Sequence, residues 1–401
     1  MLRIFISLFI LYFPHTNFAE TIRVEGLQKP AEIIVDTLGI PHIYAQEHYD
    51  AFFVQGFNAA RDRLWQIDVW RRRGLGELSA AFGKQYIQQD RANRLFLYRG
   101  DMYREWLSYG SDAKKIATAF ANGVNAYIDY LDAKPEKLPI EFSILNYSPA
   151  KWNAEDIIRI RSHGLWRNVS SELNRALILC DHGKAAANLW KKLEPSWDAI
   201  IPSGFNACDF NPDILDVYEL AKQPVRFDEN SQYSSQLSNT WIQESLGSNN
   251  WVVAPSRSAS NSAILANDPH RGHAVPSLRY IAHLNAPGIN VIGAGEPGLP
   301  GISIGHNENI AFGLTIFAID QEDLYYYEIN PLKPDVYQYQ QHDEEILSFN
   351  EVIKVRDADP VTVTLEFTRH GPIVKREKNR IYAVRAAWLE PGMAPYFGSV
   401  E

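Results

Sequence analysis

The chain is poor in cysteine, in basic runs and in long apolar segments, and each shortage removes a class of function. Its only cysteines, Cys180 and Cys208, are too few for a zinc site of their own. The formal net charge is −9, and the one basic cluster, at residues 71–73, continues an amphipathic pattern. The sequence therefore predicts no nucleic-acid partner. Beyond the first residues, no stretch is long and apolar enough to predict a membrane span.

The composition that remains is typical of a folded protein. The chain is 46% hydrophobic and 12% aromatic, so burial can outweigh the cost of ordering the backbone. Its 401 residues exceed one compact core of ordinary size. We therefore expect two domains or one large multilayered domain.

The N-terminus carries a targeting pattern. The stretch "MLRIFISLFILYF" has one positive charge, at Arg3, and an apolar run that Pro14 ends before it could cross a bilayer. Ala19 then provides a small residue before Glu20. This pattern predicts a signal peptide at residues 1–19 and a periplasmic or secreted protein, with a buried N-terminal helix as the alternative. Export would permit a disulfide between the two cysteines, and two separate buried thiols are the alternative.

Periodicity predicts helices in the first half of the chain. After strand-like runs in residues 22–46, one apolar helical face is formed by Phe53, Phe57, Ala60, Leu64 and Ile67, with Asp50 as its expected N-cap. A second helix is expected where Ile116, Phe120, Val124 and Ile128 recur at every fourth position. A third is expected to begin after Asn153.

Strands dominate the second half. Residues 206–247 are polar, broken by proline and weakly periodic, which predicts a surface linker. From residue 248 onward, short β-rich runs such as "INVIGAG" and "VTVTLEFT" follow one another. We expect an α+β fold with a long antiparallel sheet, in which residues 20–205 are mainly helical and residues 248–401 mainly strands.

The pair Gly247–Ser248 stands directly before an apolar run, in "ESLGSNNWVVAPSRS". It is either an ordinary turn or a bond that is cut. A cut would leave Ser248 with a free α-amine, whose ordinary pKa of about 7.7–8.0 lets it accept a proton from the hydroxyl of the same residue. One residue would then supply both the nucleophile and its base. Gly247 suits the tight turn that such a cut requires.

Several motifs together resemble the penicillin acylase family of N-terminal nucleophile hydrolases. They are "SNNWVVAPSRSASNSAILANDPH", "PGLPGISIGHNENIAFGLT" and "TRHGPIV", preceded by "DTLGIPHIYA" and "QGFNAARDRLWQIDVWRRRGLGELS". The resemblance implies an αββα layered sandwich and a zymogen that cuts itself before Ser248. The spacer peptide would then be residues 206–247, between a first (alpha) chain at 20–205 and a second (beta) chain from 248 onward. The mature form would be a heterodimer of these two chains.

The resemblance also implies roles for single residues. Ser248 matches the nucleophile and base, Ile316 matches the position whose backbone N–H helps to hold the oxyanion, and His270 matches a supporting position near the reaction centre. The alternative for His270, which the residue alone favours, is a histidine with satisfied hydrogen bonds beside an Asp-Pro turn. The acyl pocket would include Leu165, Trp166 and Trp251, although aromatic residues there are equally typical of a core. The family's second oxyanion donor, an asparagine, lies beyond the last matching position, so we expect a chain truncated at its C-terminus.

A cluster of carboxylates follows in "FAIDQEDLYYYE". Close carboxylates repel unless a cation or solvent lies between them, and calcium prefers oxygen ligands. The resemblance implies one structural calcium ion, with the carboxylates of Asp320, Asp323 and Glu172 and a carbonyl at Glu322 as ligands. The alternative is a solvated acidic turn.

We therefore predict an exported amidase that hydrolyses a linear amide through an acyl-enzyme. The substrate would be an acylated small molecule, of the β-lactam side-chain or N-acyl-homoserine lactone type. One alternative is an inactive, truncated remnant of such an enzyme. A second is an exported, β-rich binding module that uses the 10 tryptophans and 20 tyrosines for contacts.

Overall fold

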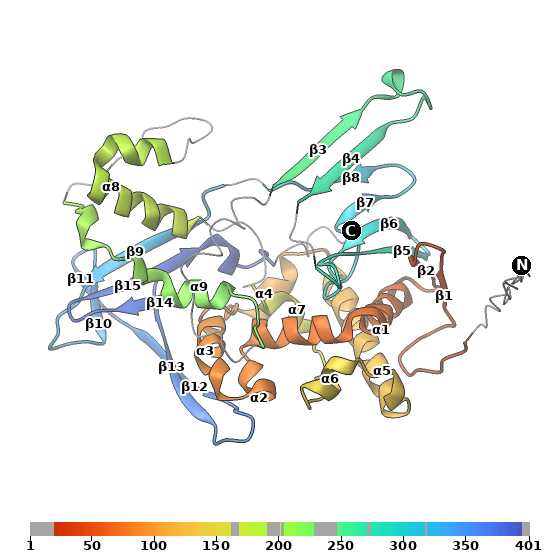
Figure 1. Ribbon diagram of the computed structural model, residues 1–401, viewed down its shortest axis with the longest axis horizontal. Helices are drawn as coiled ribbons and strands as arrows, with labels where there is room; N and C mark the ends of the chain where they lie inside the picture. Colours follow the sequence, from red (N-terminus) through yellow and green to blue (C-terminus); the bar gives the residue numbers. More distant parts are fainter. Residues whose placement is uncertain are drawn as a thin grey trace, which may run out of the picture.

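Two β-sheets and the helices that cover them organise the chain (Figure 1). The computed structural model describes residues 20–161, 168–190, 201, 204–227, 247–270, 274–316 and 319–394. Within these residues helices dominate the first half and strands the second, so the predicted α+β class is confirmed. The α-helices are α1 (His48–Leu75), α2 (Leu78–Phe82), α3 (Ile87–Leu95), α4 (Met102–Leu107), α5 (Ala113–Asp132), α6 (Ile140–Ile144), α7 (Ala154–Arg159), α8 (Val169–Trp190) and α9 (Asp216–Lys222). Short 3-10 helices are η1 (Lys84–Tyr86), η2 (Pro135–Lys137), η3 (Ala207–Asp209), η4 (Pro212–Leu215), η5 (Pro255–Arg257) and η6 (Ala387–Leu389).

The first sheet has six strands in the order β1-β2-β5-β6-β7-β8. They are β1 (Glu32–Val35), β2 (Pro41–Tyr44), β5 (Tyr280–Ala286), β6 (Ile289–Gly295), β7 (Ile304–His306) and β8 (Ala311–Phe312). All neighbours are antiparallel except β2 and β5, which pair in parallel. One face buries Ile43, Ala282 and Leu284 against the helices. Because side chains alternate along a strand, His42 and His283 lie on the opposite, outer face.

Helices α1 and α5 cross in the core beneath this sheet. The predicted apolar faces of both helices are buried there, which confirms the two helices. The helices approach so closely that a Cβ at Gly123 would lie 1.8 Å from the carbonyl oxygen of Phe53. The predicted cap is wrong, because α1 begins earlier, after Glu47. Asp50 instead accepts hydrogen bonds from the backbone N–H groups of Gln28 and Lys29, at 3.0 and 2.9 Å.

The third predicted helix is present but short. It is α7, and the Asp156 carboxylate accepts a hydrogen bond from the backbone N–H of Asn153 at 3.0 Å, as part of a capping box. The chain then leaves helical geometry at Ile160.

The second sheet has five antiparallel strands in the order β12-β13-β14-β15-β9. They are β9 (Glu322–Glu328), β12 (Leu347–Ile353), β13 (Val361–Thr368), β14 (Gly371–Arg376) and β15 (Arg380–Ala386). A separate hairpin pairs β10 (Val336–Tyr339) with β11 (His342–Glu345). A second hydrophobic core lies between the five-stranded sheet and helices α3, α8 and α9.

The expected linker at 206–247 differs from the structure in its first part. Residues 207–222 form η3, η4 and α9, and they bury Ile214, Leu215 and Tyr218 in the second core. A surface linker would not bury these side chains. Residues 228–246 lie outside the described residues.

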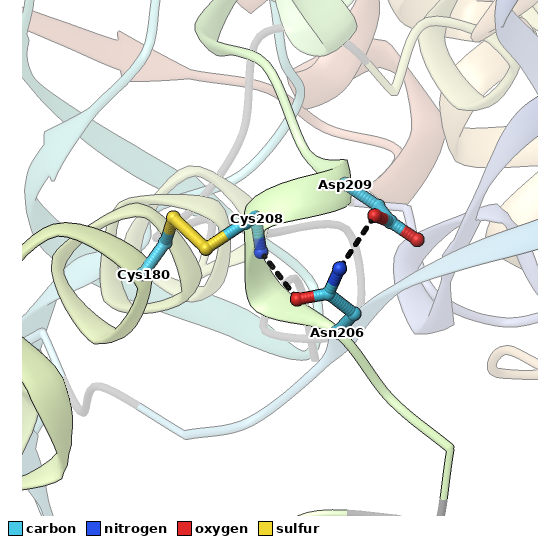
Figure 2. Close-up of a disulfide and its surroundings, with 4 residues drawn as sticks. All are labelled: Cys180, Asn206, Cys208 and Asp209. Atoms are coloured by element: carbon cyan, nitrogen blue, oxygen red, sulfur yellow. Dashed lines mark hydrogen bonds between the residues drawn. A yellow bond between two sulfur atoms is a disulfide. The ribbon is translucent and has the colours of Figure 1, made fainter.

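The two cysteines are joined in a disulfide that ties α8 to η3 (Figure 2). Their Cα atoms are 4.9 Å apart. Asn206 caps η3, because its Oδ1 accepts a hydrogen bond from the Cys208 backbone N–H at 3.3 Å and its Nδ2 donates to Asp209 at 2.7 Å. Of the two alternatives for the cysteines, the bonded one is therefore present.

The hairpin of β3 (Ser248–Val253) and β4 (Ile264–Pro269) extends away from both sheets (Figure 1). Trp251, Val252 and Ile264 on it are 56%, 74% and 45% exposed. Across the described residues, none of the helices combines the length and apolar character that a membrane crossing requires.

Candidate functional site

Ser248 is the first residue of β3 and pairs with Pro269 at the end of β4. It is half-buried, and its Oγ donates a hydrogen bond to the carbonyl oxygen of Gly247 at 2.5 Å. The same oxygen accepts a hydrogen bond from the backbone N–H of His270 at 2.9 Å. Two donors therefore converge on the carbonyl group of the bond that the sequence predicts to be cut.

The His270 side chain points along the hairpin. Its Nε2 lies 2.9 Å from Asp268 Oδ2 and 3.3 Å from Asn249 Nδ2. A Cβ at position 247 would lie 3.3 Å from His270 Nδ1, so a larger residue there would crowd the imidazole. The supporting role expected of His270 stays a prediction; what the structure shows is the hydrogen bond from its backbone N–H to the Gly247 carbonyl oxygen.

Asn267 is a residue of this site that the sequence analysis missed. Its Nδ2 donates to the carbonyl oxygens of Asn249 and Leu314, at 3.0 and 2.9 Å. Its Oδ1 accepts from the Leu314 backbone N–H at 3.1 Å. One amide side chain therefore fastens the loop at 313–316 to the strand that begins with Ser248. The "ANDPH" stretch contained this asparagine, but no local pattern indicates which loop it binds.

The loop that Asn267 holds has no room for a side chain at Gly313. A Cβ there would lie 2.7 Å from Asn250 Nδ2 and 2.9 Å from Asn267 Cβ. Ile316 is half-buried two residues beyond Leu314. Its role as a backbone oxyanion donor stays a prediction.

Of the three predicted acyl-pocket residues the structure describes only Trp251, so the pocket stays a prediction. Trp251 is more than half exposed on the hairpin, and Leu165 and Trp166 lie outside the described residues. A cavity of about 650 Å³ lies elsewhere, at the ends of β5 to β8, and includes Asn290, Glu308 and Phe312 in its lining. Trp251 does not line it.

The carboxylates of Glu172, Asp320 and Asp323 do gather at one place. One oxygen from each lies within 4.8 Å of the others, where the start of α8 meets the start of β9. Burial, and then the negative charges of Asp320 and Asp323, raise the pKa of Glu172 to about 8. This repulsion is what a cation between the three groups would relieve.

The Asn168 side chain donates hydrogen bonds to this cluster. Its Nδ2 donates to Glu172 Oε1, Asp320 Oδ1 and the Glu322 carbonyl oxygen, at 2.9, 2.8 and 2.9 Å. These acceptors belong to three of the four expected calcium ligands. Its Oδ1 accepts hydrogen bonds from the backbone N–H groups of Gln321 and Glu322, both at 3.0 Å.

The Glu322 side chain points away from the cluster into the second core. It is 1% exposed, and its carboxylate accepts hydrogen bonds from Tyr218, Trp388 and the Val169 backbone N–H. Glu322 therefore directs its carbonyl oxygen, and not its carboxylate, to the cluster, and its role as a ligand stays a prediction.

Comparisons with known proteins place the chain in one family. Residues 30–401 match the family described as Penicillin amidase. Among curated proteins, the penicillin acylase 2 proenzyme of Pseudomonas sp. (strain SE83) is 30% identical over 360 residues, which cover 88% of this chain and 45% of that protein. Penicillin G acylase of Escherichia coli is 25% identical over 400 residues, covering 89% and 47%. The acyl-homoserine lactone acylase QuiP of Pseudomonas aeruginosa is 27% identical, covering 88% and 41%.

The chain thus spans about half the length of the curated relatives it matches. Among solved structures, a thermostable penicillin G acylase from Alcaligenes faecalis is 25% identical with a TM-score of 0.34, over 44% of this chain and 96% of that chain. The family match extends from the first strand, through the Ser248 hairpin and the carboxylate cluster, to the last residue. This chain belongs to the penicillin amidase family.

Proposed function

We propose that the chain is the precursor of an amide hydrolase whose nucleophile is Ser248. The observation that carries the proposal is the pair of donors on the Gly247 carbonyl oxygen, from Ser248 Oγ and the His270 backbone N–H. The hydroxyl that must attack this carbonyl group already lies against it. The His270 N–H can hold the negative charge that develops on the oxygen.

Self-cleavage would proceed by transfer of the Gly247 acyl group from nitrogen to oxygen. Ser248 Oγ bonds to the Gly247 carbonyl carbon, the C–N bond breaks, and the hydroxyl proton passes to the Ser248 nitrogen. Water then hydrolyses the resulting ester, which leaves a Gly247 carboxylate and a Ser248 with a free amine and a free hydroxyl. The new amine can serve as the general base for that hydroxyl.

The mature site would then cut a substrate amide by the same chemistry. Ser248 Oγ attacks the amide carbonyl, the amine part leaves with a proton, and water releases the acid from the acyl-enzyme. The names of the relatives support two substrate classes, penicillins and acyl-homoserine lactones. Both present an acyl group on a linear amide.

The structure supports a longer first chain than the sequence analysis expected. The disulfide would hold any peptide that contains Cys208, and Tyr218 donates to the buried Glu322 carboxylate at 2.9 Å. Removing α9 would expose the second core. We therefore place the spacer that is removed after Lys222, within residues 223–247.

The carboxylate cluster fits calcium, because its donors are carboxylate and carbonyl oxygens only. The ion would be held by Glu172, Asp320, Asp323 and the Glu322 carbonyl, and it would supply positive charge that ties α8 to β9. No step at Ser248 passes through it. Without the ion, the Asn168 amide donates hydrogen bonds to oxygens of the same residues. The ion and the amide would therefore compete for these oxygens.

Export is part of the proposal as well. The first 19 residues have the pattern of a signal peptide, and disulfides such as Cys180–Cys208 persist mainly in oxidising compartments. Both observations support a periplasmic or secreted location.

The test combines intact mass, N-terminal sequencing and turnover. The wild-type chain should yield a new terminus that reads Ser-Asn-Asn-Trp, and Ser248→Ala should stay whole. Ser260→Ala, in the exposed turn of the same hairpin, is the matched control and should be cut normally. A phenylacetyl anilide and an N-acyl-homoserine lactone then probe hydrolysis. A cut chain without turnover supports the inactive-remnant alternative, and a folded wild-type chain that is never cut refutes the proposal.

A further inference from the structure

A chain of polar contacts crosses the outer face of the six-stranded sheet, apart from both sites described above. His42 Nδ1 on β2 and His283 Nδ1 on β5 are 3.1 Å apart. His42 Nε2 lies 3.5 Å from Asp36 Oδ2, and His283 Nε2 lies 2.7 Å from Asn290 Oδ1. Asn290 Nδ2 in turn donates to Glu308. This series of polar contacts therefore has a carboxylate at each end and two facing imidazoles in its middle.

The carboxylates determine where the protons lie. Hydrogen bonds from the backbone N–H groups of Ile40 and Leu38, both 2.9 Å from Oδ1, lower the pKa of Asp36. The hydrogen bond from Asn290 lowers the pKa of Glu308. Both groups are thus ionised and can only accept.

The amide and imidazole orientations follow from these acceptors. Asn290 must direct its NH₂ group to Glu308, and it therefore presents its oxygen to His283. His283 donates from Nε2 to that oxygen, and His42 donates from Nε2 towards Asp36. When both imidazoles are neutral, each carries one proton, so each Nδ1 then keeps a lone pair.

Two lone pairs consequently face each other across 3.1 Å. They repel unless a positive charge lies between them, and the two ionised carboxylates make the surroundings negative. In a tetrahedral zinc site with Zn–N bonds of about 2.0–2.1 Å, two imidazole nitrogens are roughly 3.3 Å apart. The observed separation of the two Nδ1 atoms is close to this nitrogen–nitrogen distance. The two rings are nearly perpendicular, at 83°.

We propose that His42 and His283 bind a divalent transition-metal ion of the zinc, nickel or copper class through their Nδ1 atoms. Imidazole suits these ions, whereas calcium and magnesium prefer oxygen. A carboxylate or amide oxygen on the other ring nitrogen is the usual partner of a ligating histidine, and Asp36 and Asn290 occupy these places. Water completes the coordination.

The site is accessible to solvent, and its ligands come from distant parts of the chain. The His42 side chain is 24% exposed, and the cavity of about 650 Å³ touches Asn290 and Glu308. His42 lies opposite His283 where β2 and β5 pair in parallel. A bound ion would therefore fasten segments that are 241 residues apart in sequence.

The test is a Zn²⁺ titration of chelator-treated protein, followed by calorimetry and by histidine ¹⁵N NMR. Wild type should bind one Zn²⁺ that His283→Asn and His42→Asn lose. Asn290→Ala, which keeps both ligands, should weaken binding by about 10–100-fold. His48→Asn is the matched control, because His48 Nε2 faces Asp112 at 3.8 Å while its Nδ1 faces the backbone oxygen of Pro287.

Two further readouts keep the result interpretable. Unchanged circular dichroism and Ca²⁺ binding in each variant show that the fold persists. On zinc binding, the ¹⁵N shifts of His42 and His283 should move at Nδ1 while Nε2 stays protonated. The proposal is overturned if His283→Asn binds as much Zn²⁺ as wild type, or if the spectra show a proton shared between the two Nδ1 atoms that zinc does not displace.

Discussion

Replacing Glu322 with glutamine tests whether the second core depends on a buried carboxylate. Tyr218 Oη donates to both carboxylate oxygens at 2.9 Å, Trp388 Nε1 donates at 2.7 Å and the Val169 backbone N–H at 3.0 Å. These donors come from α9, from η6 and from the first residue of α8. The carboxylate thus holds α8, α9, β9 and η6 together.

The magnitude follows from the count of donors. In Glu322→Gln one oxygen becomes an NH₂ group, which meets either the Val169 or the Trp388 N–H and leaves one buried donor unpaired, at a cost of about 1–3 kcal/mol. The remaining hydrogen bonds lose their charge assistance, at about 1 kcal/mol each. We expect the free energy of unfolding to fall by about 3–5 kcal/mol.

Urea denaturation followed by tryptophan fluorescence measures this change as a shift of the midpoint. Glu328→Gln is the control, because its side chain lies on the same strand, is 60% exposed and pairs with Arg380. That variant should lose no more than about 1 kcal/mol. Tyr218→Phe combined with Glu322→Gln should cost less than the sum of the two single changes.

An equal or higher stability of Glu322→Gln would refute the reasoning. It would mean that the cost of removing this carboxylate from water exceeds the gain from its hydrogen bonds, which is a known outcome for buried charges. If Tyr218→Phe left the free energy of unfolding unchanged, the contribution of α9 to the second core would be contradicted. The proposal of a longer first chain would then lose this support.

Three further predictions concern the carboxylate cluster, the disulfide and Asn267. Because the folded state raises the pKa of Glu172 from 4.5 to about 8, folded protein keeps a proton that the unfolded chain has released between these pH values. In a calcium chelator the free energy of unfolding should therefore fall as pH rises from about 4.5 to 8, and calcium should abolish this fall. Denaturation midpoints measure it, and an equal slope in Glu172→Gln would contradict it. Reducing Cys180–Cys208, which are 28 residues apart, should cost about 3–4 kcal/mol. Identical midpoints with and without reductant would argue against this value. Asn267→Ala should slow the appearance of the Ser248 terminus by about 10²-fold, because it frees the loop at 313–316. Cleavage is followed by mass, and a rate equal to that of Ser260→Ala would exclude a positioning role.

Much of the fold could be predicted because its signals are local. The apolar spacing in α1 and α5 and the β-rich runs at β6 and β13 depend on side chains that are neighbours on one helix or strand. Strand β9 was missed, because its acidic residues resemble a turn when the donors that bury Glu322 are unknown.

The candidate site was predictable in part, for the same reason. The glycine–serine pair and the carboxylates are read directly from sequence and from the family resemblance. Asn267 was not, since its role depends on Leu314, 47 residues away. The facing imidazoles of His42 and His283 depend on strands that only the fold makes neighbours.

The amino-acid sequence by itself determined the α+β class and the family, and it indicated Ser248 and the carboxylates as candidates, because spacing, composition and contiguous motifs are properties of adjacent positions. The tertiary structure alone decided that Cys180 meets Cys208, that Glu322 turns inward, and that α9 belongs to a core. Each of these outcomes depends on contacts between distant segments. Such contacts contribute free energy only in the folded chain, where the segments are neighbours.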